Sequence, residues 1–238
     1  MEAIKGKYVL LAGATGGIGS ATARLFAGAG AHLFLTGRNQ EKLNAIAAET
    51  GLPEQASLAA DISSEGQVAL LHEAYFKCYP RIDILINTAG LGIIKPFELL
   101  TADDMMRSLQ ANLLGSFNLV RSFLPHMKTE KRGLIINIPG VLGKTPMAGA
   151  AAYSASKYAL VGMMQSIREE LKRTEIRITN IYMGGVDTPF WDTIDLRVQR
   201  EKMIRADEAA KAIWFLAQQP ASAVVSEMVL QPFNHQAI

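Results

Sequence analysis

The chain has 238 residues, of which 49% are hydrophobic and 19% are charged, and its formal net charge is +2. This composition is that of a globular protein with a sizeable core, and it excludes a disordered or low-complexity chain. The single cysteine, Cys78, excludes an internal disulfide and a cysteine metal cluster, so we expect no metal site.

Short apolar runs alternate with longer segments of helical periodicity along the whole chain. The predicted strands are 8–12, 32–36, 56–60, 82–87, 133–138, 177–182 and 224–230. The predicted helices are 17–29, 40–50, 64–79, 102–127, 151–174 and 207–218. Most strand segments are continuously apolar, as in a parallel sheet covered by helices on both faces. We therefore predict one α/β domain over residues 1–238, with a doubly wound, mostly parallel seven-stranded sheet flanked by helices (Rossmann fold).

Two helix ends have clear local signals. Thr101 precedes Asp103 and Asp104, and acidic side chains in a first turn suit the helix dipole. Gly51, followed closely by Pro53, predicts the end of the second helix.

A glycine-rich turn follows the first predicted strand. The segment from Ala12 to Gly19 reads AGATGGIG, and a helical pattern begins at Gly17. Glycines allow a tight turn and a close approach of the main chain to a pyrophosphate, while the following helix offers free N–H groups. The spacing differs from G-x-G-x-x-G, and the Lys and Ser/Thr of a P-loop are absent. The alternative is a plain strand-to-helix connection, but its place as the first such turn favours a nicotinamide dinucleotide site.

Further motifs follow the later strands in order. They are Asp61-Ile62 after the third strand, Asn87-Thr88-Ala89-Gly90 after the fourth, Asn112 in the long helix, and Tyr153-Ser154-Ala155-Ser156-Lys157 after the fifth. Together with the glycine turn, they make the chain resemble the short-chain dehydrogenase/reductase family over nearly its whole length. The resemblance implies hydride transfer between a nicotinamide cofactor and a carbonyl or alcohol.

The resemblance also implies the residues that bind the cofactor. They are Gly13, Thr15, Gly17, Ile18, Gly19, Arg38, Asp61, Ile62, Asn87, Ala89, Gly90, Tyr153, Lys157, Val186 and Thr188. Asp61 would hydrogen-bond near the adenine, residues 87–90 would approach the ribose, and residues 186–188 would hold the nicotinamide carboxamide. Asn-x-Ala-Gly is also an ordinary turn sequence, so that motif alone does not distinguish a cofactor contact from a plain turn.

Tyr153 and Lys157 are four residues apart on a predicted helix, so both side chains lie on one face. A free tyrosine, with a pKa of about 10, is a poor base at neutral pH, and a neighbouring ammonium lowers that pKa. The resemblance implies that Tyr153 exchanges a proton with the substrate oxygen and that Lys157 also holds the nicotinamide ribose. The alternative is a solvated helix face.

Asn112 falls on the inward stripe of its helix, where a polar amide needs partners. The resemblance implies a catalytic role, in which a backbone adjustment at Asn112 holds a water that links to Lys157 as a proton relay. The alternative is a core asparagine whose hydrogen bonds are satisfied locally.

Two positions depart from the family pattern. Gly140 stands where the family has its catalytic serine, and the loss of one such donor typically costs about 10²–10³ in turnover. Glycine leaves room there for a water or a substrate group, and we expect Gly140→Ser to speed turnover on small ketones. Gly184 stands where the family usually has proline before Gly185, which restores an N–H beside the nicotinamide.

The end of the second strand favours NADP(H) over NAD(H). An acidic residue there would bind the adenosine ribose hydroxyls and repel a 2′-phosphate. Gly37 occupies that position, and the adjacent Arg38 can bind the phosphate through charge-assisted hydrogen bonds. The alternative is a solvated arginine that stacks on the adenine.

The residues expected to border the substrate pocket are mostly apolar. They are Leu91, Ile93, Ile94, Leu142, Pro146, Met147, Phe190 and Trp191. They suggest a small hydrophobic ketone, aldehyde or alcohol, although the same residues suit ordinary packing. The leading hypothesis is an NADP-dependent enzyme whose efficiency Gly140 reduces; the alternative is a catalytically impaired NADP(H)-binding sensor or assembly protein.

We expect a cytoplasmic protein that binds neither a membrane nor a nucleic acid. Residues 1–7 contain no long apolar stretch, and no apolar run has the length of a spanning helix. The densest basic stretch, residues 128–132, is interrupted by Thr129 and Glu130, as in a solvated loop. The family resemblance implies a homodimer or homotetramer formed through the long helices.

Overall fold

Parallel strands form one seven-stranded sheet in the computed structural model, which describes residues 2–233. The strands are β1 (Tyr8–Ala12), β2 (His32–Gly37), β3 (Ser57–Ala59), β4 (Ile84–Asn87), β5 (Arg132–Asn137), β6 (Glu175–Met183) and β9 (Glu227–Leu230). Their order is β3-β2-β1-β4-β5-β6-β9, so the direction of winding reverses between β1 and β4. This is the predicted doubly wound arrangement, and each predicted strand is present with small shifts at its ends.

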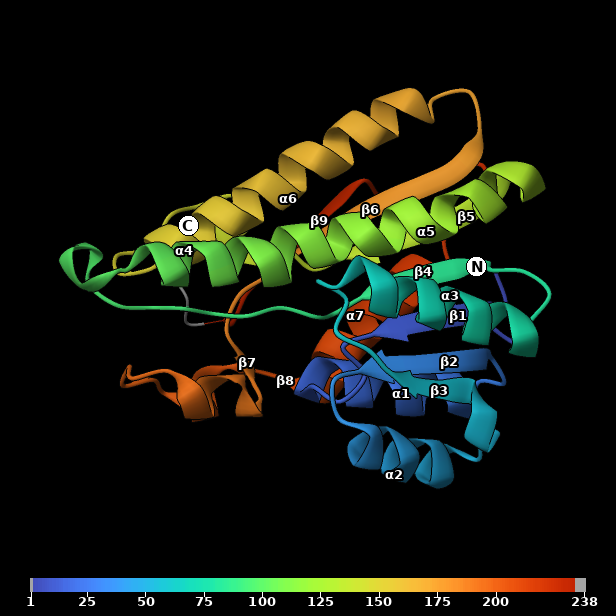
Figure 1. The fold of residues 1–238 in the computed structure, drawn as a ribbon, viewed down its shortest axis with the longest axis horizontal. Coiled ribbons are helices and arrows are strands. Elements are labelled where there is room, and N and C mark those ends of the chain that lie inside the picture. Colours follow the sequence, from blue (N-terminus) through green and yellow to red (C-terminus); the bar gives the residue numbers. More distant parts are fainter. Residues whose placement is uncertain (1, 234–238) are drawn as a thin grey trace.

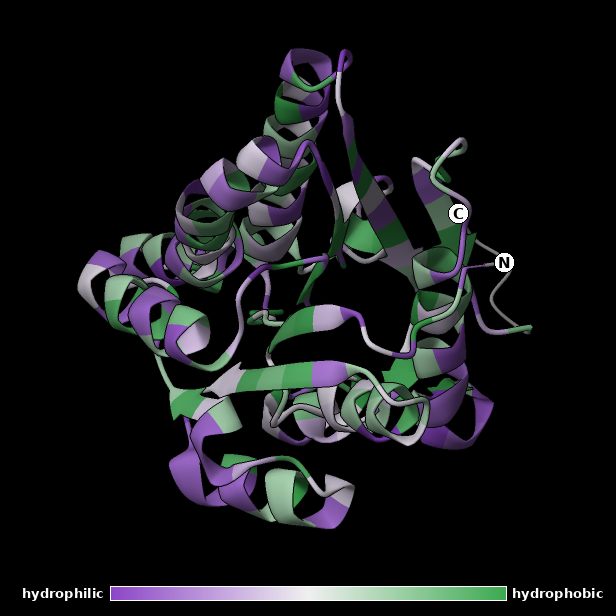
Figure 2. Ribbon diagram, turned by 90° about the vertical axis from the view of Figure 1, so that its right-hand side faces the viewer, coloured by the Kyte–Doolittle hydropathy of each residue, from purple (hydrophilic) through white to green (hydrophobic). Residues whose placement is uncertain are grey.

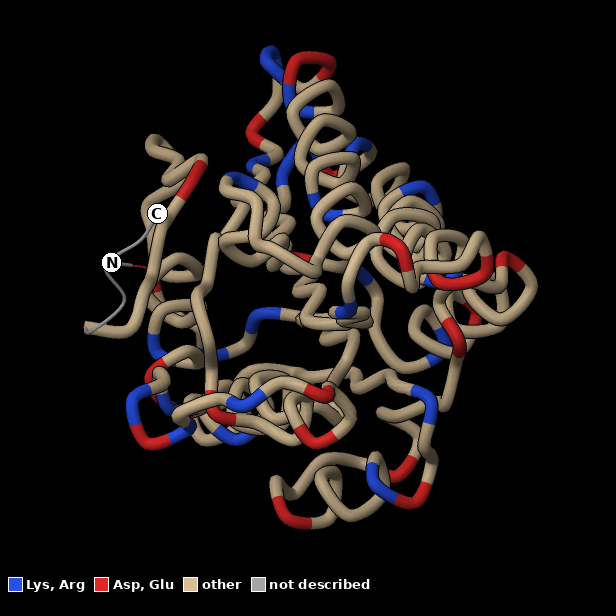
Figure 3. Tube along the Cα trace, turned by 90° about the vertical axis from the view of Figure 1, so that its left-hand side faces the viewer, with Lys and Arg blue, Asp and Glu red and all other residues tan. Residues whose placement is uncertain are grey.

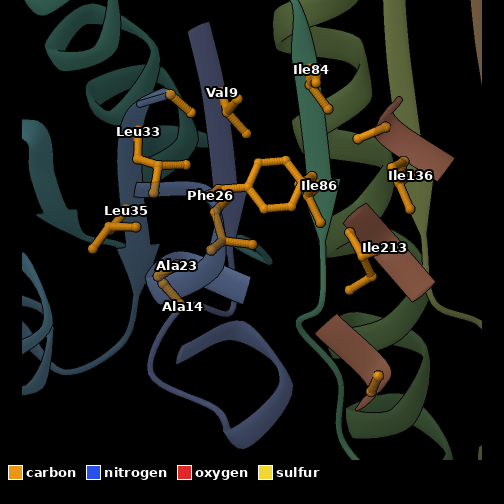
Figure 4. Close-up of a cluster of buried hydrophobic side chains, with 14 of the residues drawn as sticks. Val9, Ala14, Ala23, Phe26, Leu33, Leu35, Ile84, Ile86, Ile136 and Ile213 are labelled. Atoms are coloured by element: carbon orange, nitrogen blue, oxygen red, sulfur yellow. The ribbon is translucent and has the colours of Figure 1, made fainter. Parts of the chain in front are cut away.

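Helices cover both faces of the sheet (Figure 1). They are α1 (Gly17–Gly28), α2 (Gln40–Thr50), α3 (Glu65–Cys78), α4 (Ala102–Leu109), α5 (Gly115–Glu130), α6 (Ala151–Glu170) and α7 (Ala206–Ala217). On one face, Phe26 of α1 and Ile213 of α7 pack against Val9 and Ile86 of the strands (Figure 4). On the other face, α3, α5 and α6 contribute to a second buried core around Phe123.

The two cores explain why the strands are continuously apolar. Every residue of β4 is buried, and in β1 only the first is partly exposed, because side chains on both faces meet helices. Apolar residues accordingly follow the strands, and acidic and basic residues mix over the outer helices and loops (Figures 2 and 3). Within residues 2–233, no helix has both the length and the apolar character needed to cross a membrane.

The predicted helix ends are confirmed, but the predicted long helix 102–127 is not one regular helix. Thr101 caps α4 in a capping box with Asp104, and Gly51 ends α2 in the left-handed conformation. Between α4 and α5, residues Gln110–Leu114 form a π-helical segment, η3, around Asn112. A small second sheet of β7 (Val186–Asp187) and β8 (Ile204–Arg205) was not predicted.

Candidate active site

A cavity of about 730 Å³ opens at the carboxyl ends of the strands, where ligands bind in open α/β sheets. Predicted site residues that line it are Thr15, Gly17, Ile18, Gly19, Gly90, Tyr153, Lys157, Val186 and Thr188. A smaller cavity of about 170 Å³ lies at the amino ends of β4, β5 and β6. Charged side chains of both signs border it, such as Lys7, Asp83 and Arg132. These nine residues therefore meet at the larger cavity.

The glycine turn places the N-terminus of α1 at this cavity. The N-cap residue, Gly16, has no side chain to bond the first N–H groups, and the first turn contains no acidic residue. These N–H groups and the positive end of the helix dipole are suited to an anion such as a pyrophosphate. Gly13 does not line the cavity itself. Its φ is 78°, and a Cβ there would lie 2.5 Å from the Ala89 nitrogen, so the turn and the loop after β4 can pack together only with glycine at this position.

The loop after β4 is fixed by short hydrogen bonds. Asn87 accepts a hydrogen bond from the Ala89 N–H (3.1 Å) and donates one to Ser116 Oγ (2.8 Å). Thr88 Oγ1 donates to the Ala12 carbonyl of β1 (2.8 Å). These bonds hold the loop against the glycine turn, so Asn87 and Ala89 support the cavity wall from behind.

Asn112 joins the loop after β4 to α6. Its Oδ1 accepts from the Leu91 N–H (2.8 Å), and its Nδ2 donates to the Leu91 carbonyl and to Ser156 Oγ (both 2.9 Å). The side chain is fully buried and satisfied by protein groups, as in the alternative of a core asparagine. The backbone around it is π-helical, and the relay to Lys157 stays a prediction.

Tyr153 and Lys157 lie together on the first turns of α6. The Lys157 Nζ is 5.7 Å from the centre of the Tyr153 ring and donates to the Ile138 carbonyl (3.1 Å). Gly90 brings the loop after β4 close to this ammonium, since a Cβ there would lie 3.2 Å from Nζ and 3.1 Å from Asn112 Oδ1. The pair is therefore enclosed rather than on a solvated helix face.

Burial shifts the pKa values of both groups away from their charged forms. The pKa of Tyr153 is raised to about 12, and the pKa of Lys157 is lowered to about 8. The expected lowering of the Tyr153 pKa by its neighbour is absent, because the ammonium lies over the ring and desolvation dominates. The Tyr153 hydroxyl therefore keeps its proton at neutral pH.

The residues expected near the adenosine lie beyond the cavity wall. Asp61 accepts from the N–H and the hydroxyl of Ser63 (2.9 and 2.7 Å), and Ile62 is buried against α5. Arg38 is exposed at the end of β2, and none of these three residues borders the cavity. Lys42, on the first turn of α2, borders it and was not predicted.

Residues 7–198 match the sequence profile of the family described as short chain dehydrogenase. The chain belongs to this family. An uncharacterized oxidoreductase of Staphylococcus epidermidis is 30% identical over 98% of this chain and 100% of its own. A serine 3-dehydrogenase of Agrobacterium fabrum is 30% identical over 95% and 94% of the two chains. The crystal structure of a metagenomic short-chain oxidoreductase in complex with NADP aligns with a TM-score of 0.83, 31% identity, and coverage of 98% and 100%.

By its resemblance to the family, the chain has Gly140 at the position of the catalytic serine. Gly140 has a backbone conformation that only glycine adopts readily. Its φ of 69° and ψ of 170° are almost inaccessible to residues with a side chain. Space is not the obstacle, since a Cβ would meet only the Met183 carbonyl oxygen, at 3.4 Å. We therefore no longer expect Gly140→Ser to speed turnover. We expect it to lower the stability of the protein, because serine would strain this loop.

Gly184 makes room for the chain beyond β9. A Cβ at Gly184 would lie 2.8 Å from Pro232 Cδ, and Pro232 borders the cavity. The N–H of Gly184 donates to the Leu230 carbonyl (2.8 Å). The N–H that glycine restores at position 184 is therefore used in a hydrogen bond to β9.

A segment that we call the lid, residues 186–205, closes one side of the cavity. It contains β7, η5 (Pro189–Thr193), η6 (Arg200–Lys202) and β8. Arg200 joins its two ends by donating to Asp187 Oδ1 (2.6 Å), Asp192 Oδ1 (2.7 Å) and the Thr188 carbonyl (2.6 Å). Thr188 packs against Gly17, so Arg200 links the lid to the glycine turn.

Most of the apolar residues predicted to border the substrate pocket do border this cavity. Ile94, Leu142, Pro146, Met147, Phe190 and Trp191 border it, whereas Leu91 and Ile93 do not. The Phe190 ring lies 6.1 Å from the Tyr153 ring and occupies the place where a side chain at position 92 would be. Sequence patterns missed the lid residues Leu196, Val198, Gln199, Lys202 and Met203, because short turns have no periodicity.

Proposed function

We propose that this chain is an NADP(H)-dependent oxidoreductase that interconverts a carbonyl compound and an alcohol. The observation that carries the proposal is one cavity bordered by both the N-terminus of α1 and the Tyr153–Lys157 pair, in which Lys157 is buried and Tyr153 half-buried. The first feature suits a pyrophosphate, and the second suits proton transfer. The family and its NADP-bound structural relative support the same reaction class.

Tyr153, Lys157 and Asn112 have distinct roles in the proposed reaction. A bound nicotinamide dinucleotide supplies the hydride in reduction and accepts it in oxidation. Tyr153 donates its phenolic proton to the substrate oxygen in reduction, and its raised pKa keeps that proton in place at neutral pH. Lys157, with a pKa of about 8, is mostly charged at neutral pH and stabilises the phenolate that forms. The Asn112 side chain holds the loop beside them, and we propose that the π-helical backbone around Asn112 serves the proton relay to Lys157.

Arg38 and Gly37 support NADP(H) over NAD(H). Arg38 is exposed at the end of β2 and forms no ion pair within residues 2–233, so a 2′-phosphate there would meet a cation, with glycine rather than an acid at position 37. Arg38→Ala should weaken NADPH binding much more than NADH binding, measured by fluorescence titration with both cofactors. An equal loss for both would contradict the assignment.

The apolar lining around Tyr153 supports a substrate with a hydrophobic body. Leu142, Met147, Phe190 and Trp191 surround the position where the reacting oxygen would meet the hydroxyl. Because Gly140 offers no hydroxyl, the substrate oxygen has one side-chain donor fewer than in the family pattern, which lowers the expected turnover.

We also propose a homodimer or homotetramer formed through α5 and α6. Leu114 and Phe117, beside and within α5, and Tyr158 of α6 leave apolar surface exposed (42%, 39% and 44%). Light scattering coupled to gel filtration measures the molecular mass, and a monomer at micromolar concentration would contradict this part of the proposal.

The test of the proposed function is NADPH oxidation across a panel of ketones and aldehydes, with Tyr153→Phe as the matched variant. We expect turnover that falls by about 10²–10⁴ in Tyr153→Phe. No Tyr153-dependent turnover on any substrate, with NADPH binding intact, would favour a catalytically impaired NADP(H)-binding sensor. The glycine conformation at position 140 is the observation that favours this second candidate.

A further inference from the structure

The charged side chains that border the cavity are all cationic. They are Lys42, Lys157 and Lys202, and no aspartate or glutamate of the described residues borders it. Lys157 belongs to the proton-transfer pair, and Lys42 lies near the glycine turn, at the dinucleotide end. Neither assignment explains Lys202.

Lys202 borders the cavity from the lid, whereas Lys42 borders it from α2. Lys202 is the last residue of η6, directly before Met203 and the β7–β8 pair. The Met203 side chain packs on Gly185, where a Cβ would lie 3.3 Å from its Cγ, and the Ile204 N–H donates to the Gly185 carbonyl (3.0 Å). These contacts place the helix that carries Lys202 beside the segment that follows β6. Arg200 of the same short helix also bonds Asp192 of η5, and Phe190 of η5 lies 6.1 Å from the Tyr153 ring, so the helix is tied to the part of the lid next to Tyr153.

The short helix that carries Lys202 is anchored. Arg200 begins it and bonds Asp187, Asp192 and the Thr188 carbonyl, each within 2.7 Å. Two carboxylates thus compensate the charge of Arg200. Lys202 has no carboxylate within 4.0 Å in residues 2–233, so it is the uncompensated cation that this helix presents to the cavity.

We infer that Lys202 binds an acidic group on the substrate, so that the substrate combines an apolar body, a reacting carbonyl or alcohol, and an anionic end such as a carboxylate. This inference rests on the proposed oxidoreductase function. Lys202 is exposed, but its neighbours on the cavity side, such as Val198 and Met203, are apolar, and an anion that binds among them would be attracted more strongly to the ammonium than in open water. These apolar side chains disfavour an acidic substrate unless a cation meets it, so Lys202 decides between acids and neutral compounds.

The test compares methyl ketones that end in a carboxylate, at increasing chain length, with their methyl esters. We expect Lys202→Gln to lower kcat/KM for the acids by roughly tenfold and to leave the esters and the NADPH dissociation constant unchanged. Lys128→Gln, an exposed lysine of α5 away from the cavity, is the control and should change neither. Equal losses for acids and esters, or a weaker affinity for NADPH, would overturn the inference, since Lys202 would then serve the fold or the dinucleotide.

A binding arm separates this inference from the proposed function. Alkyl carboxylates are titrated calorimetrically into the NADP⁺-loaded protein and into the loaded Lys202→Gln variant. Binding that the variant loses supports the acidic-group site even where no ketone is turned over, in which case the oxidoreductase proposal alone has failed. Carboxylates that bind neither protein, or both equally, overturn the assignment of Lys202.

Discussion

The glycine turn and the lid border the same cavity but are held by different forces. Gly13, Gly17 and Gly19 are closed in by main-chain atoms and by Thr188, so a methyl group at any of them would collide with its neighbours. The lid has few buried side chains and depends on Arg200, whose side chain is 40% exposed. The side of the cavity formed by the glycine turn is therefore fixed by packing, whereas the side formed by the lid is held by polar contacts that single changes can alter.

The largest expected effect is on the packed side. Gly19→Ala places a methyl group against the Gly13 carbonyl, and main-chain atoms cannot move aside as a flexible side chain can. We expect a loss of about 3 kcal/mol in the free energy of unfolding, measured in urea, together with loss of NADPH binding. A stable variant that still binds NADPH would show that the turn tolerates movement.

Most of the fold and the packed side could be predicted from the sequence. Continuous apolar strands indicate a covered parallel sheet, and Thr101 and Gly51 mark helix ends by local chemistry that does not depend on distant contacts. The lid could not be predicted, because Arg200 meets Asp187 and Asp192 only through the folded chain. The left-handed φ of Gly140 likewise depends on the loop around it.

A second prediction concerns the buried ammonium between the two sides. The pKa of Lys157 is about 8 in the folded protein and 10.5 ordinarily, so between these values the unfolded chain binds the extra proton. The free energy of unfolding should therefore rise from about pH 8 to pH 10, above which the raised pKa of Tyr153 opposes the rise.

Lys157→Met removes this group while keeping its length. Because the cost of burying the ammonium is fully present below about pH 8, the variant should be more stable by about 2 kcal/mol at neutral pH and lose the rise. Urea unfolding from pH 7 to 10 measures both effects. A native protein whose stability is flat over this range would contradict the burial of a charged Lys157.

A smaller effect is expected at the loop after β5. Gly140→Ser forces a side chain into a φ of 69° and should cost about 1 to 2 kcal/mol of stability without raising turnover. Thermal unfolding and NADPH oxidation rates measure the two quantities. Faster turnover at unchanged stability would mean that the loop relaxes to a serine-compatible conformation.

The smallest effect on stability is expected in the lid. Arg200→Gln removes exposed ion pairs and should change the free energy of unfolding by less than about 1 kcal/mol, while it raises KM by freeing η5 and η6. Arg24→Gln, which breaks an exposed pair with Glu49 far from the lid, is the control and should leave KM unchanged. An equal change of KM in the two variants would contradict the claim that the polar contacts of Arg200 hold the lid over the cavity.

The central claim is that one cavity joins the dinucleotide-binding turn to proton transfer by Tyr153. The most direct measurement uses NADPH deuterated at the transferring position of the nicotinamide and follows the label into the alcohol product by mass spectrometry. The account predicts that deuterium appears on the carbinol carbon and that Tyr153→Phe nearly abolishes its transfer while still binding NADPH. Label transfer that persists undiminished in Tyr153→Phe, or NADPH that binds without transferring label to any carbonyl compound, would contradict it.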